Sequence, residues 1–319
     1  MISMVPKKYC FCTDMAAAGW RLDQYLAAQM DGLSRGQLRK VIDLGGVHVD
    51  GRRIRQCSFA LAPETKIEVF LDGRALEPFE LKEAHILFRD PYLIVLNKPA
   101  GVETQPTPAR YRGTLYQALQ QFLHNPFRPR DRAELGMVQR LDRDTSGVMV
   151  FSTHKRSHRN LSLAFAGRGA EKTYLALVAG VLADKSGEIR SYLARNRASN
   201  RVRSVAKGGK EAITRYRVLE EFPAASLLEI ELLTGRSHQI RAHFSEAGHA
   251  LLGDVRYGGA ARIGSVAVAR QMLHAVRLSL PHPVTAEPLV FESPLPEDFL
   301  TVLTHLRDKD CDFSATAPC

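Results

Sequence analysis

The chain has 319 residues and a formal net charge of +10, a length that predicts two or three domains. Hydrophobic residues make up 45% and charged residues 24%, as in folded globular proteins and unlike disordered or membrane-embedded chains. No stretch reaches the roughly 20 uncharged apolar residues of a spanning helix. The apolar N-terminal run is interrupted at Cys12, Thr13 and Asp14, so we expect no signal peptide. We expect a cytoplasmic protein with no membrane attachment.

The five cysteines are odd in number and lack zinc-site spacing, so they predict ordinary thiols and no metal site. The excess of basic residues, 44 against 34 acidic ones, favours a polyanionic partner. Residues 190–210 (RSYLARNRASNRVRSVAKGGK) are rich in arginine and lysine and contain no acidic residue. This pattern predicts an exposed basic arm or loop, with a nucleic acid as the candidate partner.

Residues 20–70 read as two helices followed by short strands. Leu22, Leu26 and Met30 recur at helical spacing, and Ser34 is a suitable N-cap for a second helix that ends at Gly45 and Gly46. The Asp50-Gly51 pair predicts a tight turn between strands. This turn leads into Arg52, Arg53 and Arg55, so basic side chains gather near one end of the small unit.

This stretch, RLDQYLAAQMDGLSRGQLRKVIDLGGVHVDGRRI, resembles the alpha-L RNA-binding module of small-subunit ribosomal protein S-four and of several RNA-modifying enzymes. The resemblance rests on the Ser34-Arg35 opening of the second helix and on the turn at 46–51. It implies an RNA-binding face, for which the candidate residues are Arg35, Arg39, Lys40, Arg52 and Arg53. A polar, acidic-leaning stretch over 73–84 predicts a linker after the module.

From residue 85 onward, strand patterns dominate and helical patterns occur between them. Strands are expected in HILFRD, LIVLNK, GVMVFST, TYLALVAGV, ITRYRVLEEF and SLLEIELL, and helices over 113–123, 155–166 and 237–247. This irregular order predicts an α+β fold with a mixed, largely antiparallel sheet. The expected divisions are a tail (1–18), the RNA-binding module (19–72), the linker (73–84), a catalytic domain (85–305) and a C-terminal tail (306–319).

Two polar clusters are candidates for a catalytic site. Residues 139–147 (QRLDRDTSG) place two carboxylates and two guanidinium groups within five residues, just before an apolar strand. An aspartate held by arginines stays ionised and can act as a nucleophile or a base, although a plain surface turn is the alternative. The second cluster, LLTGRSHQIRAHFSEAGHALLGDVRYGG, predicts a helix capped by Ser237 that presents His238 and Arg241 on one face. The histidines of this cluster have poor spacing for a metal site.

These clusters resemble the signatures of the RluA-type pseudouridine synthases. RLDRDTSG matches the RLDxxTSG signature, and the other blocks that agree in order are LIVLNKPAG, KTYLALVAG, LTGRSHQIRAHFSEAGHALLGD and LHAVRLSLPHPVT. The resemblance runs from about residue 85 to 300. An alpha-L module ahead of such a domain is typical of the members that modify large-subunit ribosomal RNA, so that RNA is the expected partner, while transfer RNA stays open.

The resemblance assigns roles to individual residues. It implies that Asp142 is the catalytic aspartate, with Tyr174 and Arg241 as its catalytic partners. It implies that Arg140 fills the RNA stack when the target nucleotide is flipped out. The remaining candidates for substrate binding are Arg236, His238 and Gln239. The reaction that the resemblance implies, the conversion of uridine to pseudouridine, needs no cofactor or metal. Nothing in the sequence demands a second subunit, so we expect a monomer.

Two alternative functions follow from the same residues. A non-catalytic RNA-binding protein could keep the basic surfaces, but it would not need Asp142, Tyr174 and Arg241 together. A hydrolase could use Asp142 and Asp144 as paired carboxylates, but alternate residues of an extended segment point to opposite faces. The chain also departs from the family pattern at Gln139, where histidine is usual, at Ala250, where proline is usual, and in the loop after Gly101.

Overall fold

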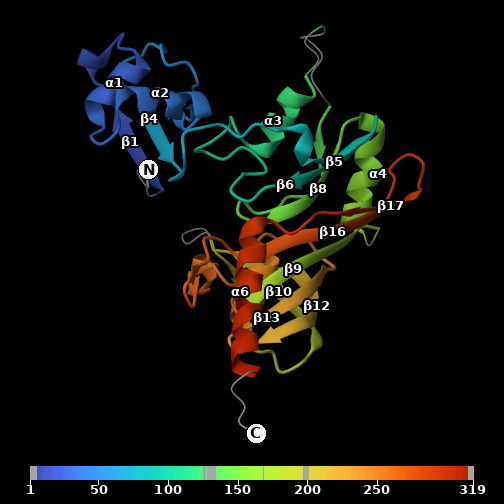
Figure 1. The fold of residues 1–319 in the computed structure, drawn as a ribbon. Helices are drawn as coiled ribbons and strands as arrows, with labels where there is room; N and C mark the ends of the chain where they lie inside the picture. Colours follow the sequence, from blue (N-terminus) through green and yellow to red (C-terminus); the bar gives the residue numbers. More distant parts are fainter. Residues whose placement is uncertain (1–5, 125–126, 128–133, 168, 197–200, 315–319) are drawn as a thin grey trace. The chain divides into compact units, whose positions relative to one another are not determined.

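The computed structural model describes residues 6–124, 127, 134–167, 169–196 and 201–314. Contacts within the chain divide it into two compact units, Met1–Lys82 with Val102–Ala133, and Glu83–Gly101 with Glu134–Cys319. This division differs from the predicted single catalytic domain over 85–305, because the described residues that follow Gly101, up to residue 124, group with the N-terminal unit. Figure 1 shows the elements of each unit.

The N-terminal unit packs two helices against a four-stranded sheet of order β1-β4-β2-β3. Its main elements are β1 (Lys7–Cys12), α1 (Leu22–Gln29), α2 (Arg35–Leu44), β2 (Val47–Val49), β3 (Arg52–Arg53) and β4 (Lys66–Leu71). Ser34 caps α2 as predicted: its hydroxyl accepts from the amide of Gln37, whose side chain accepts from the amide of Ser34. Gly45, in the left-handed conformation, ends the helix.

Part of the predicted N-terminal tail is a strand. Residues Lys7–Cys12 form β1, which pairs antiparallel with β4. Tyr9 and Phe11 alternate with exposed residues and pack against the core of the unit. This alternation is the strand signal that the sequence carries at 7–12.

The segment of residues 102–113 is held by the N-terminal unit. Arg110 is 7% exposed and binds the carboxylate of Asp72 through Nε (2.8 Å) and Nη2 (3.3 Å). The same guanidinium donates to the carbonyls of Ala75 and Glu77. Helix α3 (Leu115–Phe122) follows this segment in the same unit.

The second unit is built on an 11-stranded sheet whose main order is β11-β10-β12-β13-β9-β16-β8-β6-β5. The strands are β5 (Ile86–Arg89), β6 (Leu93–Lys98), β7 (Gly136–Met137), β8 (Ser146–Ser152), β9 (Glu171–Ala179), β10 (Ser186–Arg195), β11 (Val202–Ser204), β12 (Lys210–Phe222), β13 (Ala225–Leu232), β16 (Leu273–Pro281) and β17 (Pro288–Glu292). Of the paired strands described, only β16 and β8 run parallel. The predicted α+β class with a largely antiparallel sheet is confirmed.

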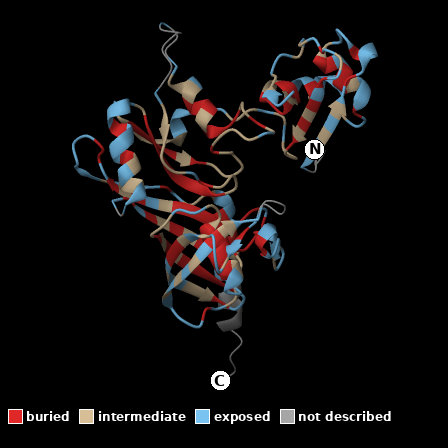
Figure 2. Ribbon diagram, turned by 180° about the vertical axis from the view of Figure 1, so that it is seen from behind, coloured by how far each residue is buried: buried red, intermediate tan, exposed pale blue. Residues whose placement is uncertain are grey.

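Helices α4 (Lys155–Ala166), α5 (Gln239–Glu246) and α6 (Glu297–Ser314) accompany this sheet. Figure 2 shows that buried residues concentrate along the strands of the large sheet. Helix α6 seats Phe299, Val302, Leu303 and Leu306 in the core that β9 and β13 also line. The predicted C-terminal tail from residue 306 is therefore partly helical, because α6 continues to Ser314.

The basic stretch 190–210 is not an extended arm among its described residues. Residues 190–195 belong to β10 and residues 202–204 form β11, which pairs with β10. Its first arginine is balanced by glutamates, since Arg190 binds Glu188 and Glu211 on the sheet surface. Strand alternation was masked in the sequence by the density of arginine.

Within the described residues, no helix is long and apolar enough to cross a membrane.

Candidate active site

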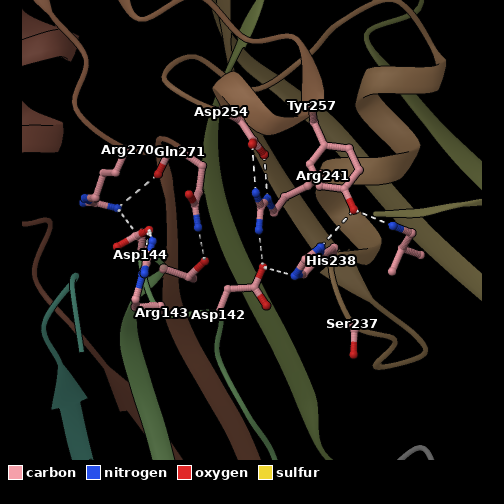
Figure 3. A network of polar contacts seen from close by, with 12 residues as sticks. Asp142, Arg143, Asp144, Ser237, His238, Arg241, Asp254, Tyr257, Arg270 and Gln271 are labelled. Atoms are coloured by element: carbon pink, nitrogen blue, oxygen red, sulfur yellow. Dashed lines mark hydrogen bonds and ion pairs between the residues drawn. The ribbon is translucent and has the colours of Figure 1, made fainter. Parts of the chain in front are cut away.

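Asp142 lies in a tight turn that precedes the buried strand β8. The amide of Thr145 donates to the carbonyl of Asp142 (3.1 Å), and the Asp142 side chain is 25% exposed. Its Oδ2 accepts a hydrogen bond of 2.8 Å from Nη1 of Arg241 on α5 (Figure 3). The structure therefore joins two clusters that lie 99 residues apart in the sequence. The carboxylate is both ion-paired and accessible.

Arg241 is fixed by a second carboxylate, that of Asp254. Its Nε and Nη2 donate to the two oxygens of Asp254 at 2.5 and 2.8 Å, and Asp254 is 2% exposed. The ring of Tyr257 lies against the guanidinium, 4.9 Å from Cζ to the ring centroid. Burial acts to lower the pKa of Arg241, but the bonds to Asp254 and the charge of Asp142 outweigh it and raise that pKa. Arg241 is thus a permanent cation held in one direction.

His238 stands on the other side of the aspartate. Its Nε2 is 3.8 Å from Oδ2 of Asp142, and its Nδ1 is 2.9 Å from the hydroxyl of Tyr257. That hydroxyl accepts from the amide of Val202 (2.8 Å), so its own proton can go to Nδ1, and the neutral ring then carries its proton on Nε2. Burial lowers the pKa of His238 and outweighs the attraction of Asp142. The imidazole is therefore neutral at pH 7.

The cap of α5 differs from the prediction. His238 itself is the N-cap residue and adopts a left-handed backbone conformation (φ 53°), which is uncommon for a residue other than glycine. Ser237 lies outside the helix, and its hydroxyl accepts from Nη2 of Arg140 at 3.4 Å. The left-handed turn aims the imidazole toward Asp142, a function that sequence propensity alone would not reveal.

Tyr174 comes from β9, in the middle of the sheet, and is 7% exposed. Burial raises the pKa of Tyr174 well above its ordinary value, and the nearby charge of Asp142 adds to the shift. Both causes keep the phenol protonated.

A buried lysine, Lys98, holds the turn that follows Asp142. Lys98 has no exposed surface, and its Nζ donates to the carbonyls of Pro99 (3.0 Å), Arg143 (2.8 Å) and Thr145 (2.8 Å). The amide of Gly101 donates to the carbonyl of Arg143 as well (3.0 Å). The backbone that follows Asp142 is therefore fixed by the strand end that carries the LNKPAG block.

The other predicted substrate contacts occupy different settings. Arg140 is exposed, and Arg236 donates through Nε to the carbonyl of Glu211 (2.8 Å). Gln239 is 2% exposed, and its Nε2 donates to Ile213 and Thr214 while its Oε1 accepts from Thr234 and the amide of Arg236. A direct contact of Gln239 with substrate would require these bonds to be exchanged.

The predicted RNA-binding residues of the N-terminal unit divide into two groups. Arg35 donates twice to the buried carboxylate of Asp23, and Lys40 pairs with Glu77 at 3.0 Å. Arg53 is partly buried and donates to the carbonyl of Thr107 in the 102–113 segment. Arg39, whose side chain is 61% exposed and 4.0 Å from Asp23, and the exposed Arg52 have a more open setting.

Sequence reasoning did not single out Lys98, Asp254 or Tyr257. Asp254 and Tyr257 lie in the GDVRYG stretch, where an acid after a glycine turn was the available signal. Lys98 ends an apolar strand. A lysine at the end of such a strand is the available signal of a buried ammonium whose hydrogen bonds are all satisfied within the protein. Asp254 and Tyr257 orient the guanidinium of Arg241, and Lys98 orients the backbone that follows Asp142.

Comparisons with known proteins agree with this geometry. Residues 92–246 match the model of the RNA pseudouridylate synthase family, and residues 20–67 match the S4 domain. The chain is 36% identical over 303 residues to ribosomal large subunit pseudouridine synthase D of Pseudomonas aeruginosa, covering 91% of this chain and 92% of that protein. It is 34% identical to an uncharacterized RNA pseudouridine synthase of Aquifex aeolicus, covering 90% of this chain and 94% of the relative.

Among solved structures, human RNA pseudouridylate synthase domain containing 4 aligns with a TM-score of 0.58 and 25% identity, covering 70% of this chain and 93% of the other. These findings confirm the resemblance that RLDRDTSG and the alpha-L stretch indicated. With near full-length relatives and a matched model that spans the turn of Asp142, the chain belongs to the RNA pseudouridylate synthase family and carries an N-terminal S4 domain.

Proposed function

We propose that this enzyme isomerises specific uridines of large-subunit ribosomal RNA to pseudouridine, in the cytoplasm and as a monomer. The observation that carries the proposal is the accessible Asp142 carboxylate bonded to the fixed Arg241. Ribosomal RNA is favoured because the relatives from Pseudomonas aeruginosa and Nitrosomonas europaea are both called ribosomal large subunit pseudouridine synthase D.

The reaction is an internal exchange of bonds. The bond from the sugar carbon C1′ to ring nitrogen N1 breaks, the uracil turns, and a new bond joins C1′ to ring carbon C5. The hydrogen of C5 leaves as a proton, and N1 gains one, so that atoms and electrons balance without a donor or an oxidant. A carboxylate, a proton carrier and a closed pocket for the base meet these needs.

Asp142 supplies the reacting carboxylate in this proposal. Arg241 binds its Oδ2 and fixes its direction, and Asp254 with Tyr257 keeps Arg241 from turning away. His238, neutral and bonded to Tyr257, adds a hydrogen-bond donor beside the carboxylate. The site therefore stabilises one anion without neutralising it by proton transfer.

Tyr174 acts in this proposal as a platform for the uracil ring. A phenol whose pKa is raised by burial and by the charge of Asp142 is a poor base at neutral pH. Its ring can stack on the base, and its hydroxyl can donate a hydrogen bond. This favours binding of the base over removal of the C5 proton by a phenolate.

The target nucleotide has to leave its stack to reach this site. The exposed Arg140, two residues before Asp142, has the length and planar cation to occupy the vacated position. The S4 domain supplies a separate RNA contact through exposed arginines such as Arg39 and Arg52.

Tritium release from RNA labelled at uracil C5 tests the proposal. We expect release by the parent enzyme on ribosomal RNA, and a loss of at least about 10³-fold in Asp142→Asn. RNA affinity should stay within a few fold because phosphate contacts dominate it. Asp144→Asn is the matched control: its carboxylate pairs with Arg143 and not with Arg241, so turnover should persist.

Three outcomes would contradict the proposal in different ways. Release from transfer RNA alone would overturn the ribosomal substrate. Free uracil in place of pseudouridine would indicate a hydrolase. A folded protein that binds ribosomal RNA and assembly precursors without any release would indicate a non-catalytic binder.

A further inference from the structure

The backbone that carries Asp142 is held by a second buried cation, Arg270. We call residues 142–145 the catalytic loop. Arg270 is 7% exposed and precedes β16, and its Nη1 donates to the carbonyl of Asp144 at 3.0 Å (Figure 3). The adjacent Gln271 donates through Nε2 to the hydroxyl of Thr145 at 3.3 Å. Neither contact belongs to the Asp142, Arg241 and Asp254 network.

Together with the contacts of Lys98, this accounts for every carbonyl of the catalytic loop. The carbonyl of Asp142 accepts from the amide of Thr145, and those of Arg143 and Thr145 accept from Lys98. The carbonyl of Asp144 has Arg270. The buried cations of Lys98 and Arg270 therefore bind the three consecutive carbonyls of residues 143–145. A change in the direction of either cation should displace the loop.

The direction of Arg270 is set by the first turn of α6. Asp298 accepts from Nε (2.5 Å) and Nη2 (2.8 Å) of Arg270. The remaining Nη1 donates to the carbonyl of Asp144 in the loop and also to those of Gln271 (3.1 Å) and Leu273 (3.3 Å). A planar guanidinium bound along one edge presents its other edge in a fixed direction. Asp298 itself has no contact with the Asp142 carboxylate, and its side chain is 48% exposed.

Helix α6 is also held in place by contacts other than the Arg270–Asp298 ion pair. Phe299, next to Asp298, is fully buried, and Val302, Leu303 and Leu306 continue the apolar face. A second arginine pair, between Arg307 and Glu220 on β12, anchors the other half of the helix. Removing the Asp298 carboxylate should therefore leave the helix in place, while Arg270 loses the charged partner that holds its Nε and Nη2.

We propose that Asp298 is a positioning residue for catalysis, which acts through Arg270 on the catalytic loop and hence on Asp142. The inference rests on the proposed pseudouridine synthase activity. The C-terminal helix thereby supports the reacting carboxylate from outside the site.

The test compares two variants that each remove one arginine partner of α6. Asp298→Asn should lower kcat about ten- to a hundredfold, because small displacements of a reacting group are costly, with KM within about threefold. Glu220→Gln, which breaks the matched pair with Arg307, should leave both unchanged. Hydrogen–deuterium exchange of a peptide over 139–147 should accelerate in Asp298→Asn alone. Asp298→Glu, which keeps the charge, should restore part of kcat.

The outcomes separate this inference from the proposed function. An equal fall of kcat in Asp298→Asn and Glu220→Gln would reduce Asp298 to a helix anchor and overturn the proposal, as would unchanged kcat and exchange. A parent enzyme without turnover would refute the proposed function, while the exchange comparison still tests the link to the loop. If Asp298→Asn does not fold, Arg270→Lys replaces it, because an ammonium keeps the buried charge but cannot bind Asp298 along one edge and Asp144 along the other. Parental kcat and exchange in Arg270→Lys would overturn the inference.

Discussion

His274 illustrates how a buried titratable residue ties stability to pH. It lies in β16 with no exposed surface, and its ring nitrogens contact the hydroxyl of Ser146 (2.9 Å) and the carbonyl of Ser293 (3.2 Å). Burial is the main cause that lowers the pKa of His274 to about 4. Since an unfolded histidine has a pKa of about 6.5, the unfolded chain binds this proton first as pH falls.

We expect the free energy of unfolding to fall between pH 6.5 and pH 4. A pKa lowered on folding means that stability is complete above the unfolded pKa and is lost as pH decreases, by about 3 kcal/mol for this residue. His274→Asn should flatten the slope in that window, whatever its effect on stability at pH 7. Urea unfolding at half-unit pH steps measures the slope, and a variant slope equal to the parental one would contradict this origin.

At the residue scale, the sequence predicted Asp142 and Arg241 of the candidate site but not the residues that orient them. Asp142 and Arg241 come together as the resemblance implied, while their catalytic roles stay predictions. Asp254 could not be assigned, because a carboxylate 13 residues from Arg241 identifies no partner until the fold brings the two together. The left-handed His238 was hidden for the same reason, since only tertiary contacts can maintain such a backbone.

At the element scale, Gly147 shows why the catalytic loop must end as it does. Gly147 lies opposite Ala275 in the parallel pairing of β8 with β16, one residue after Ser146 pairs with His274. Its φ is +117°, and a Cβ at this position would lie 2.2 Å from the carbonyl oxygen of Ala275. Backbone atoms cannot give way as a side chain can, so the two strands would have to separate.

Gly147→Ala should therefore lose at least about 3 kcal/mol of unfolding free energy. Gly208→Ala is the control: it also has a positive φ, +76°, but an added Cβ meets nothing within 4 Å. Its cost should be limited to the backbone strain, about 1 to 2 kcal/mol. Equal losses in the two variants, measured by urea unfolding, would show that strand approach is not the limiting factor.

Elements with strong local signals were predicted well. The helix expected over 155–166 is observed as Lys155–Ala166, and the Ser34 cap and Gly45 end of α2 follow from side-chain chemistry. The stretch 190–210 was misjudged as an arm because charge density hid its pairing with neighbouring strands. Strand pairing depends on partners far along the chain, which local patterns do not specify.

At the scale of the whole molecule, RNA binding by the S4 domain is best tested by single charges. Removing residues 1–82 would strip Asp72 from the buried Arg110, and an uncompensated buried cation would disturb what remains. Substitution at exposed positions avoids this effect. Arg39 and Arg52 are suitable because their side chains are open to solvent.

We expect the double variant Arg39→Gln, Arg52→Gln to weaken RNA binding and to reduce the slope of log affinity against log salt by about 1.5, the contribution of two phosphate contacts. Arg39→Lys, Arg52→Lys keeps the charges and should keep the slope. Filter binding between 50 and 200 mM salt measures both. An unaltered slope in the glutamine variant would mean that these residues do not contact phosphates.

The division of the chain also dictates an order of events during synthesis. The chain passes between the two units after Lys82, Gly101 and Ala133. During synthesis, β5 and β6 therefore leave the ribosome before Arg110, which the N-terminal unit needs. At that point their sheet partner β8 has not yet been made. Neither unit is complete before synthesis of the other has begun. A gene fusion that moved residues 1–82 alone would therefore carry the S4 domain away without Arg110, the buried partner of Asp72.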